Sequence, residues 1–388
     1  MRTTTGTGAE AACRWYRIAA LFGVVAAVML SPSPAEAQYF GRNKVQYSVF
    51  DFRVLGTEHY DVHYYSEIST AAREAARMAE RWYTRLSQLL DHQMTSRQPL
   101  VLYANHGDFQ QTNVVPGMID ESTGGVTEGL QRRVVMPLGA TRQDTDHVLG
   151  HELVHAFQYD IASAHGGPAA TGNLPLWAME GMAEYLSVGR SDPHTAMWLR
   201  DAVLHDDVPT LGQLSTDGRY FPYRFGQAVW AYIGGRYGDA RIGEIYRTAL
   251  DEGLATALAE VLEVNPDSLS AAWVAAVKDA YAPLLEGRAA PDDVARRVMD
   301  GSGGIAETML APAVSPDGSR IAFLWVRDLS IDLYVLDART GTAPRRLLTQ
   351  ATESRFDALS FMGSAGTWSP DGTRLATVVF SGGRQEIA

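Results

Sequence analysis

Cysteine is almost absent from this sequence of 388 residues. The only cysteine, Cys13, precedes a short apolar run at 18–30, so it does not stand where a lipid-modified cysteine would follow a cleavage site. Removal of the first 37 residues would leave no cysteine at all. That excludes disulfides, thiol catalysis and cysteine-ligated zinc in the remaining chain.

Long apolar runs are also scarce near the N-terminus. The run at 18–30 is shorter than the roughly 20 residues that span a membrane. Arg14 and Arg17 precede it, and the small-x-small pattern Ala35-Glu-Ala37 follows it before Gln38. This order predicts a secretory signal peptide over 1–37 and export to the periplasm or the medium. The alternative is an uncleaved anchor, which would be the only contact with a membrane.

Positive charge is in deficit. The chain has 33 lysines and arginines against 45 acidic residues, which gives a net charge of −12. The two signs are mixed along the sequence, and this argues against nucleic acid as a partner. The hydrophobic content of 46% is that of an ordinary globular protein, and the length suffices for two or three domains.

Two regions follow the signal peptide. The first, 38–140, combines strands with one helix, and the second, 141–285, is mostly helical. By apolar periodicity we expect helices at 68–90, 224–237 and 269–285, and strands at 57–65, 99–103 and 125–138. Asn265 is the expected N-terminal cap of the last helix, and a Gly-, Asp- and Ala-rich linker follows at 286–307.

The motif His151-Glu152-Leu-Val-His155 lies in the helical region. Residues four apart share one face of a helix, so both imidazoles can reach one metal ion. Glu152 then lies next to a metal-activated water and can accept its proton. We expect Thr145 or Asp144 to cap this helix.

A hydrolytic zinc site needs a third protein ligand. The segment 174–186 (LPLWAMEGMAEYL) offers Glu180, separated from His155 by 24 residues, which is enough for a loop and a returning helix. Pro175 can open that helix. Glu184 lies one turn after Glu180 on the same face.

Together, HELVHAFQ and LPLWAMEGMAEYL resemble the gluzincin clan of metallopeptidases, the thermolysin and aminopeptidase-N type. The resemblance implies Zn²⁺ held by His151, His155 and Glu180, with Glu184 hydrogen-bonded to a ligand histidine. Glu184 as the ligand itself, or as a solvated charge, stays open. His147 is interpreted as a helix-start residue near the cleft.

Two weaker resemblances extend the site. Gluzincins offer a tyrosine or histidine to stabilise an oxyanion, and Tyr223 is our choice over Tyr220, with an aromatic core residue as the alternative. The stretch 125–129 (GVTEG) loosely resembles the aminopeptidase element G-x-M-E-N, from which it departs at Thr127 and Gly129. We interpret Gly125 and Glu128 as substrate-lining residues on an edge strand that pairs with an extended peptide. Glu128 is otherwise a surface charge.

The C-terminal region repeats itself. SPDGSRIAF at 315–323 recurs as SPDGTRLAT at 369–377, and the strand-like DLYVLD lies between them at 332–337. This pattern resembles the blade repeat of TolB-type β-propellers, and it implies a partial propeller over 308–388 that binds a protein partner or restricts access to the site. Two hairpins packed on the preceding domain are the alternative.

These resemblances imply an α+β fold: a thermolysin-like domain with a mixed sheet and a mostly helical half, followed by incomplete all-β structure. They imply a secreted zinc peptidase with Glu152 as general base, more in keeping with an endopeptidase than an aminopeptidase. A non-catalytic envelope scaffold with a vestigial zinc site is the rival hypothesis. Glu152 argues against it, since a structural zinc needs no base.

Overall fold

The computed structural model describes residues 44–115, 119–299, 308–327, 330–341, 344–349, 355–362 and 365–388. The predicted signal peptide and residues 300–307 of the predicted linker lie outside these ranges. Among the described residues, no helix combines the length and the apolar character that a membrane span requires.

A five-stranded mixed sheet comes first, in the order β1-β2-β3-β5-β4. Its strands are β1 (Arg53–Gly56), β2 (Tyr60–Tyr64), β3 (Gln98–Tyr103), β4 (Val126–Glu128) and β5 (Arg133–Pro137). β2, β3 and β5 pair in parallel, while β1 and β4 add to the two sides in antiparallel fashion. Among the described strands, β4 therefore lies at one edge.

The strand predicted at 125–138 is wrong as a single element. It is a hairpin, β4 and β5, in which Thr127 faces Val134. Fourteen residues exceed the usual strand length of about five or six. Arg132 adopts a left-handed φ of 52° in the connection, and this turn reverses the chain.

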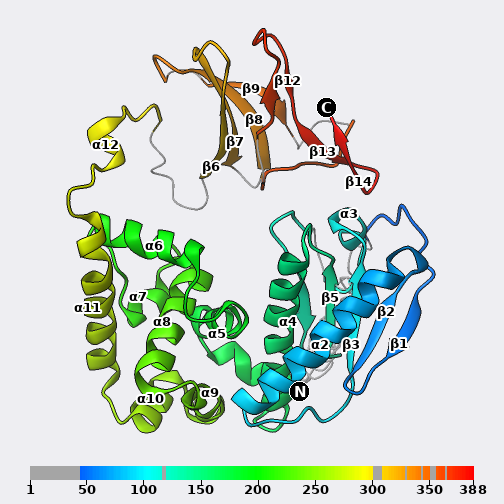
Figure 1. Ribbon diagram of the computed structural model, residues 1–388, viewed down its shortest axis with the longest axis vertical. Helices are drawn as coiled ribbons and strands as arrows, with labels where there is room; N and C mark the ends of the chain where they lie inside the picture. The colour runs from blue at the N-terminus through cyan, green and yellow to red at the C-terminus, as the bar shows by residue number, and fades with distance from the viewer. Residues whose placement is uncertain are drawn as a thin grey trace, which may run out of the picture. The chain divides into compact units, whose positions relative to one another are not determined.

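Two helices cover this sheet (Figure 1). Helix α2 (Ser69–Leu89), entered through the short η1 (Ser66–Ile68), confirms the helix predicted at 68–90. Its stripe of Ala72, Ala79 and Leu86 is fully buried because residues seven apart return to the same helix face. The stripe packs on β2 and on the second helix, α4 (Arg142–Ser163).

Helix α4 is capped by Thr141, not by Asp144 or Thr145 as predicted. The Thr141 hydroxyl accepts from the Asp144 amide, and the Asp144 carboxylate accepts from the Thr141 amide. This reciprocal capping box satisfies two backbone donors. It places Asp144 in the first turn, where a carboxylate favours the positive end of the helix dipole.

The helical half follows. Its elements are η2 (Pro168–Asn173), α5 (Leu176–Val188), α6 (Pro193–Leu204), α7 (Leu211–Thr216), α8 (Pro222–Tyr237), α9 (Ala240–Glu252), α10 (Leu254–Leu262), α11 (Pro266–Leu285) and α12 (Pro291–Val294). The short helix α3 (His106–Phe109) lies earlier, between β3 and the hairpin. Helices α8 and α11 confirm the helices predicted at 224–237 and 269–285. The Asn265 side chain caps α11 as expected, accepting from the amides of Asp267 and Ser268.

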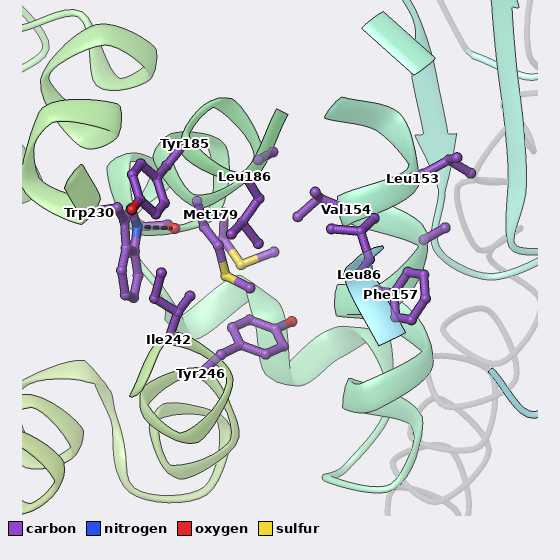
Figure 2. Close-up of a cluster of buried hydrophobic side chains, with 14 of the residues drawn as sticks. Leu86, Leu153, Val154, Phe157, Met179, Tyr185, Leu186, Trp230, Ile242 and Tyr246 are labelled. Atoms are coloured by element: carbon purple, nitrogen blue, oxygen red, sulfur yellow. Dashed lines mark hydrogen bonds between the residues drawn. The ribbon is translucent and has the colours of Figure 1, made fainter. Parts of the chain in front are cut away.

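Helices α5 and α8 pack closely against each other. A Cβ on Gly181 would lie 2.3 Å from the backbone of Gly226, so only glycines permit this approach. The indole of Trp230 on α8 donates to the Ala178 carbonyl of α5 at 3.0 Å. Figure 2 shows the buried side chains that join this pair to α4, among them Met179 and Phe157.

The C-terminal region is all β. Its described strands are β6 (Thr308–Val314), β7 (Arg320–Arg327), β8 (Ser330–Asp337), β9 (Arg345–Thr349), β10 (Ala358–Leu359), β11 (Thr367–Trp368), β12 (Leu375–Ala376), β13 (Val378–Ser381) and β14 (Arg384–Ile387). They form sheets of four, three and two strands, and none of these sheets closes on itself among the described residues.

The two SPDG copies have the same turn structure. Asp317 accepts hydrogen bonds from the Ser315 and Ser319 hydroxyls, and Asp371 does the same from Ser369 and Thr373. The glycine that follows each aspartate has a left-handed φ, 69° at Gly318 and 68° at Gly372. The sequence repeat is therefore a structural repeat. The fold as a whole is α+β with several separate sheets.

Candidate metal centre

Three side chains from two helices converge between α4 and α5. His151 and His155 lie on consecutive turns of α4, and Glu180 lies on α5, which begins directly after Pro175 as predicted. His151 Nε2 lies 3.1 Å from His155 Nε2 and 3.2 Å from Glu180 Oε2, and the third side of the triangle, from His155 Nε2 to Glu180 Oε2, is 3.1 Å. The predicted ligands thus meet at one point.

This donor set fits a zinc ion. Zinc–nitrogen and zinc–oxygen bonds of about 2.0–2.2 Å correspond to ligand separations of about 3.3 Å in a tetrahedron. The observed triangle is close to that spacing, and among the described residues these three form the metal-capable group of histidines and carboxylates. Three protein ligands leave one position for water or substrate, as in a catalytic rather than a structural zinc site.

The charges around the triangle favour a cation. Burial opposes a charge on His151, but its interactions with Glu180 and Glu184 outweigh burial and raise its pKa to about 10. Burial also opposes the charge on Glu180, yet the neighbouring histidines hold the pKa of this carboxyl well below its usual range. A metal ion that binds here must displace a proton from histidine.

Glu184 holds His151 from the side away from the triangle. It is buried, and its Oε1 lies 3.3 Å from His151 Nδ1. Its Oε2 lies 3.1 Å from the Arg224 guanidinium and 3.4 Å from His147 Nε2. A carboxylate at this distance is placed to orient a ligand histidine. His147 therefore meets Glu184 and lies outside the ligand triangle.

Two supporting residues were not foreseen from the sequence. Arg224 on α8 bridges the buried Glu184 and the partly buried Asp192, 3.4 Å away, so its positive charge lies between the two carboxylates. Gln158 is fully buried, and its amide oxygen lies 2.7 Å from His155 Nδ1. That bond leaves His155 Nε2 for the triangle. The position of Gln158 one turn after His155 could have identified it from the sequence. No sequence pattern pointed to Arg224.

Glu152 lies beside the triangle, against the edge strand. Its side chain is buried, and a Cβ on Gly125 would come within 2.8 Å of Glu152 Cγ. The Thr127 hydroxyl lies 2.7 Å from Glu152 Oε2. The predicted base is therefore held between α4 and β4. Gly125 lies directly against the Glu152 side chain.

The two candidate tyrosines, Tyr223 and Tyr220, have different neighbours. The Tyr223 ring stacks on His151, with centroids 5.9 Å apart and planes 17° apart. Burial and the charges of Glu180 and Glu152 raise the pKa of Tyr223 well above its usual range, so its hydroxyl stays protonated and can donate. Tyr220 instead donates to Asp207 at 2.6 Å and is buried away from the triangle's contacts.

Glu128 is already paired. Its carboxylate accepts from the Arg133 guanidinium at 2.6 and 2.8 Å, across the β4–β5 hairpin. A carboxylate neutralised in this way is less suited to binding a free substrate amine. Among the described residues, the metal-capable group does not include Glu128.

Neither family models nor curated protein sequences match this chain.

Proposed function

We propose that the chain is an exported zinc-dependent peptidase of gluzincin type that cleaves within extended peptides. The observation that carries this proposal is the convergence of His151, His155 and Glu180, with the Glu152 carboxylate beside them. Three ligands leave a coordination position open for water, and an adjacent buried carboxylate supplies a base.

The metal ligands, Glu152 and Tyr223 have separate roles in the proposed reaction. A zinc ion at the triangle would lower the pKa of water and polarise the scissile carbonyl. Glu152 accepts the proton of the attacking water and delivers it to the departing amine. The Tyr223 hydroxyl, kept neutral by its surroundings, donates a hydrogen bond to the carbonyl oxygen as negative charge develops on it.

The edge strand supports a peptide substrate. β4 has β5 as its partner on one side and ends the sheet on the other, among the described strands. An extended peptide can add to such an edge by main-chain hydrogen bonds, whatever its sequence. A peptide added to this edge would lie near α4, which carries Glu152, since β4 packs on that helix.

Internal cleavage is favoured over N-terminal trimming because Glu128 is paired with Arg133. We further propose a thermolysin-like arrangement for residues 38–285 and a partial propeller for 308–388 that binds partners or restricts access. The paired SPDG turns support the latter proposal. Export rests on the predicted signal peptide at 1–37.

The test is digestion of an unstructured peptide pool, read by mass spectrometry, with the wild type and Glu152→Gln, each with and without a chelator. We expect internal cuts that both the mutation and the chelator abolish, while zinc stays bound to Glu152→Gln. Sequential N-terminal losses that Glu128→Ala abolishes would establish an aminopeptidase instead. A folded, zinc-loaded wild type that cuts nothing would contradict the proposal.

A further inference from the structure

A single hydroxyl on the edge strand contacts Glu152 at two atoms. Thr127 Oγ1 lies 2.7 Å from Glu152 Oε2 and 2.9 Å from the Glu152 backbone oxygen. A threonine hydroxyl has one proton to donate and can also accept. It can therefore donate a full hydrogen bond to the Glu152 carboxylate or to the Glu152 backbone carbonyl, but not to both at once.

This contact requires an unusually close approach of strand and helix. Gly124, Gly125 and Gly129 flank Thr127, and a Cβ on each would meet a side chain of α4: Val148 at 3.3 Å, Glu152 at 2.8 Å and Tyr159 at 3.0 Å. The three α4 residues lie along one side of the helix. The small residues let β4 lie close enough for the hydroxyl to reach the carboxylate.

The Glu152 carboxyl is thereby confined on both sides. Gly125 faces its Oε1, which a Cβ there would approach to 2.9 Å, and Thr127 binds its Oε2. A glutamate side chain has several rotatable bonds, so an unheld base would sample many orientations. A hydrogen bond to Oε2 selects one orientation and leaves Oε1 for the proton of water.

The same hydroxyl suits the protonated base. When Glu152 carries the proton of water on Oε1, its Oε2 is the carbonyl oxygen of the acid and still accepts from the Thr127 hydroxyl. The two atoms are already within hydrogen-bond distance. The carboxyl keeps a partner while it holds the proton and after it has released it.

We infer that Thr127 is a positioning residue for Glu152 in the proposed peptide hydrolysis. The inference rests on the proposed function, and it assigns a role to the position where this chain departs from the aminopeptidase element. The competing role is structural: the hydroxyl would only tie β4 to α4 through the carbonyl of residue 152.

The test compares Thr127→Val, which keeps the shape and removes the hydroxyl, with Thr127→Ser, which restores it. Thr123→Val, the same chemical change on the approach to β4, is the matched control. We expect Thr127→Val to lower kcat by about ten- to a hundredfold, below the 10²–10⁴ range of a lost general base, with KM within about twofold. Thr127→Ser should recover most of the activity, and Thr123→Val should match the wild type.

Two readouts separate positioning from structure. Zinc content and the unfolding midpoint of Thr127→Val should match the wild type, and in the Glu152→Gln background the change should have no further effect on residual activity. A crystal structure of Thr127→Val should show the Glu152 carboxyl displaced or spread over several rotamers.

The outcomes are distinguishable. An active wild type with Thr127→Val equally active, or with Glu152 unmoved, overturns the role of Thr127 and leaves the proposed function standing. A wild type that cleaves no peptide overturns the proposed function, while the Glu152 rotamer in Thr127→Val still decides whether the hydroxyl positions this side chain.

Discussion

Helix α4 carries two buried clusters of histidine and carboxylate that look alike in composition and differ in arrangement. Near its middle, His151 and His155 meet Glu180 of α5. Near its end, Asp160 is fully buried and meets His92, 2.7 Å away. Composition alone would not rank one cluster above the other as a functional site.

The difference lies in where the atoms point. The Asp160 oxygens each have donors of their own: His92, the Thr95 amide and hydroxyl, and Arg132. In the other cluster three potential ligand atoms face one another within 3.2 Å, and partners such as Gln158 hold them from outside. A cluster satisfied from within stabilises the fold, whereas one that converges on a shared point can bind an ion.

The largest effect should come from His155→Ala, which removes a corner of the triangle. We expect zinc affinity to fall by more than the roughly hundredfold that loss of a supporting residue can cost, measured by competition with a chromogenic chelator. His92→Ala is the matched control, a histidine of the other cluster, and should bind zinc like the wild type. Equal losses in both variants would erase the distinction between the clusters.

Asp160→Ala should act on stability instead. Its removal leaves Arg132 and His92 without their buried partner, which we expect to lower the free energy of unfolding by about 3–5 kcal/mol, measured by urea titration. Zinc stoichiometry of the folded fraction should be unchanged. Asp251→Ala removes a more exposed His–Asp pair of similar length, 2.8 Å, and should cost less than about 1 kcal/mol.

Glu184→Gln tests the support behind the triangle. The amide keeps an acceptor near His151 but loses the charge that Arg224 and His147 face, so we expect zinc affinity to fall by about 10- to 100-fold with the fold intact. Glu244→Gln, which alters an exposed pair with Arg241, serves as the control in the same chelator assay. Unchanged affinity in Glu184→Gln would show that Glu184 has no part in holding the ligand.

The smallest effect concerns pH. Burial opposes the charge of Asp160, but hydrogen bonds from His92 and Thr95 outweigh it and hold its pKa below its usual value. A carboxyl with a lowered folded-state pKa contributes stability above its unfolded pKa of about 3.9, and this contribution is lost as the pH falls through the folded value. The stability gap between wild type and Asp160→Asn should therefore narrow below about pH 4, as urea titrations at several pH values can measure. A constant gap would mean that the Asp160 charge is not what stabilises this cluster.

Local patterns predicted much of the fold. Apolar residues recurring at spacings of three and four, Ala72, Ala79 and Leu86 among them, identified α2, and the Asn265-Pro266-Asp267 start identified α11, because helix faces and caps are set by neighbours in sequence. The hairpin at 125–138 was missed. The alternation of apolar and polar residues is the same for one strand and for two. The left-handed residue of the turn is Arg132, so no glycine indicates that position.

The candidate site divides in the same way. The sequence by itself determined the pairing of His151 with His155 and the presence of Glu152 between them, since helix geometry places residues four apart on one face. It also singled out Glu180, through a resemblance rather than through spacing. Only the tertiary structure decided that Thr127 and Arg224 contact this site and that Glu128 forms an ion pair with Arg133. Those contacts join segments distant in sequence or opposite in a hairpin, and their distances depend on how closely the glycines let strand and helices pack.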